Sequence, residues 1–322
     1  MNISGTKVAI IGTGNVGATT AYSLTVQGVC SELVLIDRNQ EKAMGEVLDL
    51  QHSIEYLNRN VRVSTGDYSQ CQDAHIVVIT ASGSMDGVHS RLDLLDKNIP
   101  IMKEIVDQVM ASGFNGYIIV VSNPVDVLSY YVYKRSGLSK SQVIGTGTSI
   151  ETARLKQIIG ERMRVDPRSV DAFAMGEHGD SQVVPWSHVR VGGKSFDDIL
   201  EDNSHRFQEV DKEKIVEMTR MAGSEVLRRK GNTEYGIASA TTGIIKSILR
   251  DENQIITVST LLEGEYGEYD VYCGVPVILG KEGVIEIGEY RLTADEKEKF
   301  HASCEIIREH INKLSLDKTD KR

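Results

Sequence analysis

The stretch KVAIIGTGNVG, residues 7–17, decides the fold of the first half of this chain. An apolar run at 7–11 leads into three glycines, Gly12, Gly14 and Gly17, and the pattern up to residue 27 is helical. In such a unit the first glycine permits a tight turn, the second admits a pyrophosphate, and the third lets helix and sheet pack closely. The start of the helix also offers unpaired N–H groups and a positive dipole end. The stretch therefore predicts a dinucleotide-binding turn.

Asp37 strengthens this prediction. It ends the next apolar run, 32–36, and lies 20 residues after Gly17. A carboxylate at this place accepts hydrogen bonds from ribose hydroxyls and repels a ribose phosphate, so the pattern favours NAD over NADP. Arg38, next in the chain, weakens that preference slightly. The competing interpretation is a glycine turn in an unrelated α/β domain.

Short apolar runs and longer helical patterns alternate through the first half of the sequence. Runs such as IVVIT and YIIVVS are apolar on both sides, as expected for strands buried inside a parallel sheet. This alternation predicts an α/β fold with a Rossmann-type, doubly wound parallel sheet. The expected strands are 7–11, 32–36, 61–64, 75–80, 117–121 and 143–145, and the expected helices are 15–27, 41–55, 91–111 and 125–135.

The second half predicts a mixed sheet backed by helices. Its expected strands lie near 169–175, 183–191, 255–261 and 277–279, and its expected helices are 211–230, 233–250 and 293–313. No linker rich in Pro or Ser follows the last parallel strand. We therefore expect two closely packed domains: an NAD-binding Rossmann domain, 1–147, and an α+β domain for substrate binding and catalysis, 148–322.

Composition argues against several classes of function. Of 322 residues, 40% are apolar and 25% are charged, which is ordinary for a globular protein. The net charge of −10 opposes binding to nucleic acid or to an anionic membrane, and no apolar stretch is long enough to span a bilayer. The four cysteines are far apart, so we expect packing thiols in a reducing, cytoplasmic compartment, and no metal site.

Four further segments carry side chains suited to acid–base chemistry and to binding carboxylates. They are the glycine-containing loop 82–90 that leads into Arg91, Asn123 after an expected strand, the helical pair Glu151 and Arg154, and His178. Singly, each has a plain structural explanation, such as a surface ion pair or a loop histidine. Two of them follow the carboxyl ends of strands in a dinucleotide fold, where ligands bind, and this position favours a functional role.

At this level of detail the sequence resembles the L-lactate/L-malate dehydrogenase family over nearly its whole length, and its lactate dehydrogenases most. The resemblance rests on GTGNVG (12–17), Asp37, SRLDLLDKN (90–98), VSNPVD (121–126), VIGTGTSIETAR (143–154), GEHGDS (176–181) and KGNTEYGIA (230–238). It implies NAD as cofactor, a small 2-oxo or 2-hydroxy acid as substrate, and a role in glycolysis or fermentation. It also implies a homo-oligomer, with a tetramer favoured over a dimer.

The resemblance also implies a role for each site residue. His178 is the base that takes the hydroxyl proton, since imidazole titrates near neutrality, and Glu151 holds its ring. Arg154 grips the substrate carboxylate, while Arg91 polarises the carbonyl oxygen. The other implied positions are Asn123 at the carbonyl and the nicotinamide, Thr233 and Met85 at the substrate side chain, and Gly12, Gly14, Val16, Gly17, Asp37, Lys42, Tyr68, Ser82, Gly83 and Thr146 at NAD.

Met85 departs from the family at the loop position that selects the substrate. Relatives carry Gln there when they act on lactate, and Arg when they act on malate and must pair a second carboxylate. No arginine occurs in 82–90, and Asp86 adds a negative charge, so a second carboxylate would be costly to place there. We therefore disfavour malate, and expect activity on pyruvate with tolerance for larger apolar 2-oxo acids.

Two other departures concern catalysis and regulation. Glu151 stands where relatives have Asp, and moving a carboxylate by roughly 1 Å can cost ~100-fold in rate. In the alternative case Glu151 does not meet His178 and the enzyme is weak.

Many bacterial relatives bind fructose 1,6-bisphosphate through Arg and His, where this chain has Lys156 and Asp171. Because Asp171 opposes a phosphate, activation by this effector is doubtful.

Rival interpretations remain open at this stage. Within the same class they are a malate dehydrogenase and an L-2-hydroxyisocaproate-type dehydrogenase with little lactate activity. NAD-dependent glycosidases resemble the superfamily but use a metal bound by Cys and His, and no Cys lies between Cys71 and Cys273. A third alternative is a dinucleotide-binding protein without turnover.

Overall fold

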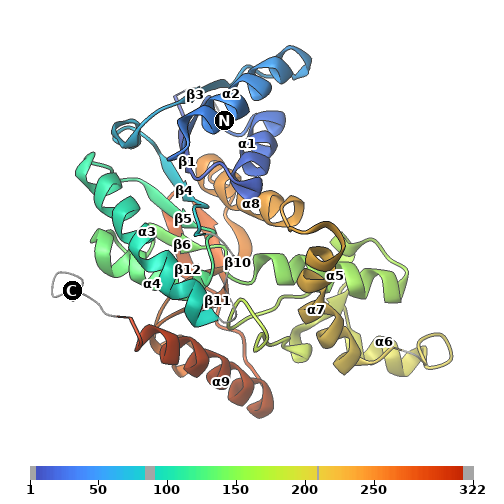
Figure 1. Cartoon of the computed structure of the whole chain (residues 1–322). Helices are drawn as coiled ribbons and strands as arrows, with labels where there is room; N and C mark the ends of the chain where they lie inside the picture. Colours follow the sequence, from blue (N-terminus) through green and yellow to red (C-terminus); the bar gives the residue numbers. More distant parts are fainter. Residues whose placement is uncertain (1–4, 84–90, 209, 315–322) are drawn as a thin grey trace.

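The computed structural model describes residues 5–83, 91–208 and 210–314 (Figure 1). Within these residues, six parallel strands form the sheet of the first half, in the order β6-β5-β4-β1-β2-β3. They are β1 (Lys7–Ile11), β2 (Glu32–Ile36), β3 (Arg62–Thr65), β4 (Ile76–Ile79), β5 (Tyr117–Val120) and β6 (Val143–Gly145). All residues of β1 and β4 are buried, as their two-sided apolar sequences require. The predicted Rossmann-type sheet is confirmed.

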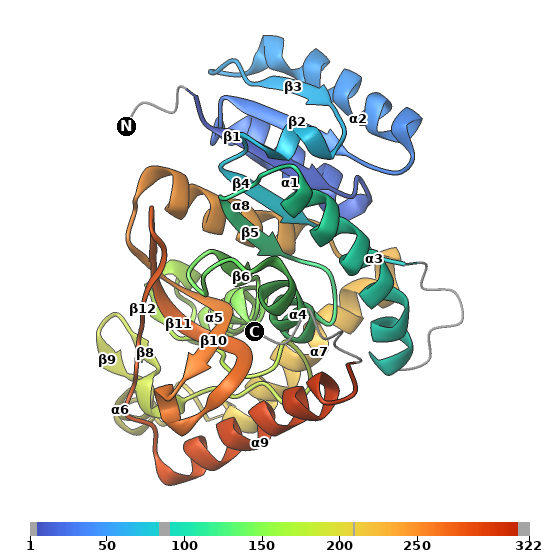
Figure 2. The same cartoon turned by 90° about the vertical axis from the view of Figure 1, so that its left-hand side faces the viewer.

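The helices that connect these strands lie on the two faces of the sheet. They are α1 (Asn15–Gln27), α2 (Gln40–Ser53), α3 (Arg91–Ala111) and α4 (Val125–Ser136), with short 3-10 turns η1 (Ile54–Tyr56) and η2 (Tyr68–Cys71). Strand order reverses direction between β1 and β4, so right-handed crossovers put α1 and α3 on opposite faces. Accordingly α3 packs beside α4, and α1 packs beside α8 (Tyr235–Arg250) (Figure 1, Figure 2).

The mixed sheet expected in the second half is joined to the first sheet. Strands β10 (Gln254–Glu263), β11 (Tyr269–Gly280) and β12 (Gly283–Ile287) form an antiparallel ladder, and β10 pairs with β6 at Ser259 and Gly145. This pairing satisfies backbone groups at an edge that β6 would otherwise leave open. The described residues thus form one nine-stranded sheet that runs through both halves of the chain.

The rest of the second half forms a smaller lobe with its own apolar core. The lobe contains α5 (Ser149–Met163), η3 (Pro167–Ser169), β7 (Val170–Asp171), η4 (Trp186–His188), β8 (Arg190–Val191), β9 (Lys194–Ser195), α6 (Phe196–Asp202) and α7 (Lys212–Lys230). Leu155, Phe196 and Ile215 are almost fully buried in its core. Because α5 also contacts α8 and β10, the lobe is held firmly against the sheet (Figure 1).

Three strand predictions in the second half were wrong in extent. The expected strand 169–175 is only Val170–Asp171, and the expected strand 183–191 pairs in a ladder only at Arg190–Val191. Pro185, which has no N–H to donate, and the turn η4 interrupt the second of these. The expected short strand 277–279 is instead the end of β11, which begins at Tyr269.

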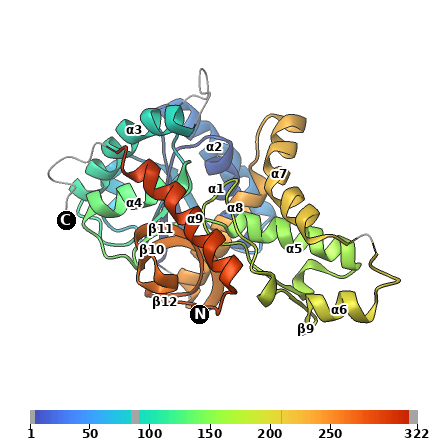
Figure 3. The same cartoon turned by 90° about the horizontal axis from the view of Figure 1, so that it is seen from below.

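Helix α9 (Ala294–Ile311) closes the described chain. It begins at a capping box, in which Thr293 and Glu296 each bond the other's backbone, and it packs against β11 and α4 (Figure 3). All four cysteines are free and buried, which confirms their prediction as packing thiols. Within the described ranges we find no helix with the length and apolar content to cross a membrane.

Candidate active site

The glycine turn has the geometry that its sequence predicts. Gly12 has φ of 100°, and a Cβ there would lie 2.6 Å from the Ala81 nitrogen. A Cβ on Gly17 would lie 1.9 Å from the Gly12 carbonyl oxygen, so close packing of α1 on the turn excludes a side chain. A Cβ on Gly14 would meet no atom within 4 Å. Gly14 therefore leaves open space at the start of α1, where the helix N–H groups point outward.

Asp37 lies beside this turn at the end of β2. Its Oδ2 accepts the Thr13 N–H at 2.6 Å and the Thr13 hydroxyl at 2.9 Å, and its Oδ1 accepts the Asn39 N–H at 2.9 Å. Burial acts to raise the pKa of Asp37, but these bonds and the charge of Lys42 lower it below its usual value. The carboxylate is therefore ionised at neutral pH and fixed in place.

A hollow of about 470 Å³ lies against these groups, and we call it the glycine-loop hollow. Of the predicted cofactor residues, Gly12, Gly14, Asp37, Lys42, Tyr68 and Ser82 line it. Gly17 is at the helix–sheet contact instead, and Gly83 is not among the lining residues; its N–H bonds the Asn98 side chain. The hollow is thus built from the carboxyl ends of β1, β2 and β4.

A second hollow, of about 510 Å³, includes Val16 on α1, two residues after Gly14 of the first hollow, and we call it the histidine hollow. The predicted residues that line it are Val16, Asn123, Thr146, Arg154, His178 and Thr233. They come from both halves of the chain. Its apolar wall includes Ile150, Leu227 and Ile237. The structure therefore brings together most of the residues that the sequence singled out.

Glu151 joins two of these side chains. Its Oε2 lies 3.0 Å from His178 Nδ1, and its Oε1 accepts a bond from Arg154 at 2.9 Å. The Glu151 side chain is 3% exposed, so both contacts form away from solvent. Because a carboxylate accepts, Nδ1 carries the proton and Nε2 remains for a ligand. The alternative in which Glu151 does not reach His178 does not hold in the structure.

The charges in this cluster shift both pKa values. Burial acts to lower the pKa of His178, but the charge and hydrogen bond of Glu151, together with the charge of Asp126 on α4, outweigh it, so the pKa is raised. Burial acts to raise the pKa of Glu151, but His178 and Arg154 lower it overall. The pair thus favours an ionised carboxylate beside a protonated imidazole, which is an acid ready to give its proton from Nε2.

Gly223 gives Arg154 its space. A Cβ at Gly223 on α7 would lie 3.1 Å from both terminal nitrogens of the Arg154 guanidinium. The guanidinium thus lies between Glu151 and the backbone of α7 at Gly223. Arg154 also lines the histidine hollow. Such a planar cation suits a carboxylate ligand.

Two buried polar residues near the site received no role from the sequence. Asn98 on α3 accepts the Gly83 N–H at 2.8 Å and donates to the Asn123 carbonyl at 2.7 Å, so it ties the loop to the site. Asp126 on α4 accepts the backbone N–H of His178 at 2.8 Å. The only sequence signal was an Asn within an apolar helical pattern, and an Asp three residues after Asn123.

Other predicted residues lie elsewhere. Met85 lies outside the described residues, and so does the side chain of Arg91, whose backbone begins α3. Lys156 is on α5, and Asp171 is exposed on β7.

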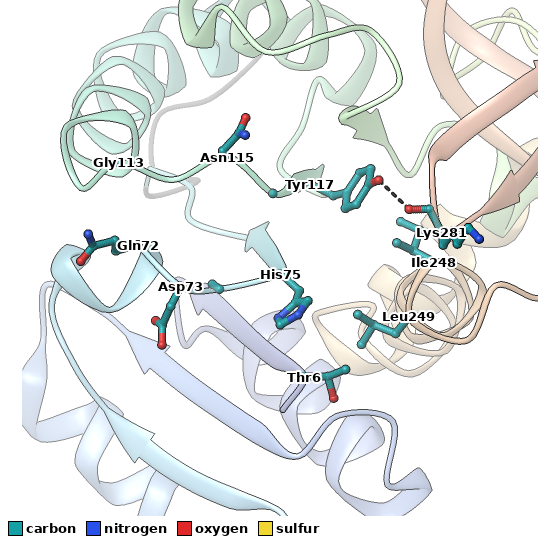
Figure 4. Close-up of a pocket in the computed structure, with 12 residues that line it drawn as sticks. Thr6, Gln72, Asp73, His75, Gly113, Asn115, Tyr117, Ile248, Leu249 and Lys281 are labelled. Atoms are coloured by element: carbon teal, nitrogen blue, oxygen red, sulfur yellow. Dashed lines mark hydrogen bonds between the residues drawn. The ribbon is translucent and has the colours of Figure 1, made fainter. Parts of the chain in front are cut away.

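Another hollow, of about 480 Å³, lies at the opposite end of the sheet, by the amino ends of β1, β4 and β5. Figure 4 shows Thr6, His75, Tyr117, Leu249 and Lys281 around it. It contains none of the predicted site residues, so we assign it no part in the activity.

Comparison with known proteins gives one consistent result. The sequence model of the lactate/malate dehydrogenase NAD binding domain matches residues 6–145, and that of the family's alpha/beta C-terminal domain matches residues 148–316. L-lactate dehydrogenase 1 of Bifidobacterium longum is 51% identical over 308 residues, which is 96% of this chain and 98% of that protein. L-lactate dehydrogenase 3 of Bacillus cereus is 48% identical over 308 residues, which is again 96% of this chain and 98% of that protein.

The fold also matches solved structures. The minor L-lactate dehydrogenase of Enterococcus mundtii in its ligands-bound form superposes with a TM-score of 0.94 at 45% identity, over 98% of this chain and 100% of that one. Its ligands-unbound form gives a TM-score of 0.89 over the same shares.

Proposed function

The chain belongs to the lactate/malate dehydrogenase family, and on this premise we propose that it interconverts pyruvate and L-lactate by hydride transfer with NAD. It is an NAD-dependent oxidoreductase that acts on a 2-hydroxy acid. The observation that carries the proposal is the Glu151 bridge, which holds His178 and Arg154 at one hollow beside the glycine turn. An acid–base group and a carboxylate-binding cation are what this reaction requires.

The residues of the glycine-loop hollow fit the cofactor. Gly14 leaves room for a pyrophosphate at the start of α1, and the fixed carboxylate of Asp37 suits ribose hydroxyls. Val16 and Asn123 border the histidine hollow, where the nicotinamide end would be held. When bound, the cofactor supplies or accepts the hydride at the substrate carbon.

The protein's own groups supply binding and the proton. Arg154 holds the substrate carboxylate, which sets the carbonyl oxygen towards His178 Nε2. In reduction the protonated His178 gives its proton to that oxygen, and in oxidation the neutral ring takes the proton back. Glu151 keeps the ring oriented and stabilises the imidazolium. We further propose that Arg91 polarises the carbonyl and that Thr233 borders the substrate side chain.

We propose that the domain 1–147 binds NAD and that the domain 148–322 completes the substrate site, as the sequence predicts. β6 ends at Gly145 and α5 begins at Ser149, so the backbone changes direction between them. Arg154 and His178 come from the second part, and Asn123 and Thr146 from the first. The two parts share the histidine hollow, which supports closely packed domains.

We also propose a cytoplasmic homotetramer that serves fermentation. Four free, buried thiols support a reducing compartment. Exposed apolar side chains on α1, α2 and α8, such as Tyr22, Leu48 and Tyr235, support contact between copies of the chain. Sedimentation of the purified protein measures this assembly.

A direct assay tests the proposed function. Purified protein is mixed with NADH and pyruvate, and the near-ultraviolet absorbance of NADH is followed while the product is identified on a chiral column. We expect pyruvate-dependent loss of NADH and formation of L-lactate. Binding of NADH without turnover of pyruvate or any other 2-oxo acid would contradict the proposal.

Substrate choice should follow the chemistry of the histidine hollow. Its wall is apolar at Ile150, Leu227 and Ile237, and Glu234 adds a buried carboxylate. We expect kcat/KM for oxaloacetate to be at least about tenfold below that for pyruvate, because a second carboxylate would meet this apolar wall. Lys230, which also lines the hollow, is already paired with Glu234, and the sequence 82–90 carries no arginine. 2-Oxoisocaproate should also be reduced. A panel in which oxaloacetate is the best substrate would overturn this prediction.

Fructose 1,6-bisphosphate should have little effect. Asp171 is exposed on β7 and would repel a phosphate approaching Lys156 on α5. We expect millimolar effector to change the KM for pyruvate by less than about twofold. Pyruvate saturation curves with and without effector measure this, and a many-fold drop in KM would refute it.

A further inference from the structure

Asp126 is a buried carboxylate that touches the catalytic loop and has no role in the mechanism above. It is 3% exposed and lies in the first turn of α4. Its Oδ2 accepts the backbone N–H of His178 at 2.8 Å, and its Oδ1 accepts the hydroxyl of Ser259 on β10 at 2.6 Å. One side chain of the first half therefore joins the catalytic loop to the antiparallel extension of the sheet.

The loop around His178 is also held by neutral groups. The backbone of Gly176 exchanges two hydrogen bonds with Gly274 on β11, both of 2.8 Å. The N–H of Glu177 donates to the hydroxyl of Ser303 on α9 at 2.8 Å. Asp126 thus differs from these two anchors of the loop backbone, because it brings a charge as well as a hydrogen bond.

The titratable and charged groups near His178 come from several elements. Glu151 and Arg154 lie on α5, and Asp126 lies on α4. Across the hollow, Lys230 and Glu234 pair with each other. On the loop itself, Glu177 accepts a bond from Ser181, and Asp180 follows, while the Cys273 thiol of β11 lies near Asp126.

Asp126, Glu151, Arg154 and His178 form an inner cluster of charged groups. With both carboxylates ionised, its net charge is zero only when the His178 imidazole is protonated. When both carboxylates are ionised, Asp126 and Glu151 together carry two negative charges and Arg154 carries one positive charge, so these three side chains leave one negative charge. A protonated His178 cancels it. In a site removed from water such a balance is worth more than at the surface.

We propose that Asp126 is a positioning residue that fixes the backbone of His178 and, through its charge, keeps the imidazole protonated towards neutral pH. This inference rests on the proposed function. The protonated ring is the form that gives a proton to a 2-oxo acid, so Asp126 would favour reduction at neutral pH. Burial raises the pKa of Asp126 overall, while the hydrogen bonds from Ser259 and from the His178 N–H, together with the charge of His178, favour its ionised form.

The Asp126→Asn variant tests the charge while keeping the shape. Its amide oxygen can still accept the His178 N–H. We expect kcat/KM for pyruvate reduction to fall about tenfold at about pH 8 but to stay within about twofold at about pH 6, because His178 loses its proton earlier as the pH rises. The matched control is Ser303→Ala, which removes a neutral anchor of the same loop and should lower activity equally at both pH values.

Two further measurements keep the inference separate from the proposed function. An NMR titration of the His178 ring needs no turnover, and should show its midpoint at lower pH in Asp126→Asn than in the natural chain. If that variant does not fold, Ser259→Ala should move the midpoint the same way by less, because it removes a bond that stabilises ionised Asp126. An active enzyme whose profile and midpoint are unchanged in the charge-removing variant overturns the inference, whereas an inactive natural chain overturns the proposed function.

Discussion

Replacing His178 with Asn is expected to lower kcat/KM for pyruvate reduction by about a thousandfold, within the range that removal of a general acid produces. The ring's Nδ1 lies 3.0 Å from Glu151 Oε2, which leaves Nε2 as the proton donor at the hollow. An asparagine amide can occupy part of the space and donate a hydrogen bond, but it cannot give up a proton at neutral pH. The loss should therefore appear mainly in kcat.

NADH binding and a matched variant distinguish this chemical loss from a folding defect. His52→Asn changes an exposed histidine at the end of α2, outside both hollows, and should leave kcat/KM within about twofold. Both variants should bind NADH as the natural chain does, as measured by quenching of protein fluorescence. Near-normal turnover by the His178 variant would remove this residue from the mechanism.

Replacing Arg154 with Gln is expected to lower kcat/KM for pyruvate by about a thousandfold, or ~4 kcal/mol, as loss of one partner of a buried charge pair does. The guanidinium bonds Glu151 at 2.9 Å and faces the hollow beneath Gly223. Without it, the other Lys or Arg among the described residues that line the hollow is Lys230, which is already paired with Glu234. We expect the KM for pyruvate to rise steeply, with NADH binding preserved.

Two comparisons sharpen this result. Arg154→Lys keeps the charge but loses the planar fork, so it should recover only part of the activity. Arg162→Gln changes an exposed arginine on the same helix, α5, and should leave KM unchanged. A KM for pyruvate that stays constant in the Arg154→Gln variant would show that the carboxylate binds elsewhere.

Local patterns in the sequence were sufficient for much of the site. The glycine turn and Asp37 follow from spacing along one strand–helix–strand unit, and Glu151 and Arg154 meet because residues three apart share a helix face. These arrangements depend on neighbours in the chain. The fold of the first half was predictable for the same reason, since each strand and helix shows its own period.

Contacts between distant residues were not predictable in this way. Asp126 reaches His178 from 52 residues away and Ser259 from 133 residues away, and no local period encodes either bond. Likewise, the pairing of β10 with β6 is decided by which edge is free after the parallel sheet has formed. His178 itself was placed by resemblance to relatives rather than by spacing.

A crystal structure with NADH and oxamate, the unreactive amide that has the shape of pyruvate, tests the central claim most directly. We predict that the oxamate carboxylate lies on the Arg154 guanidinium, with its carbonyl oxygen at hydrogen-bond distance from His178 Nε2 and the nicotinamide against the carbonyl carbon. Oxamate bound with its carboxylate away from Arg154, or with its carbonyl oxygen out of reach of His178, would contradict the account.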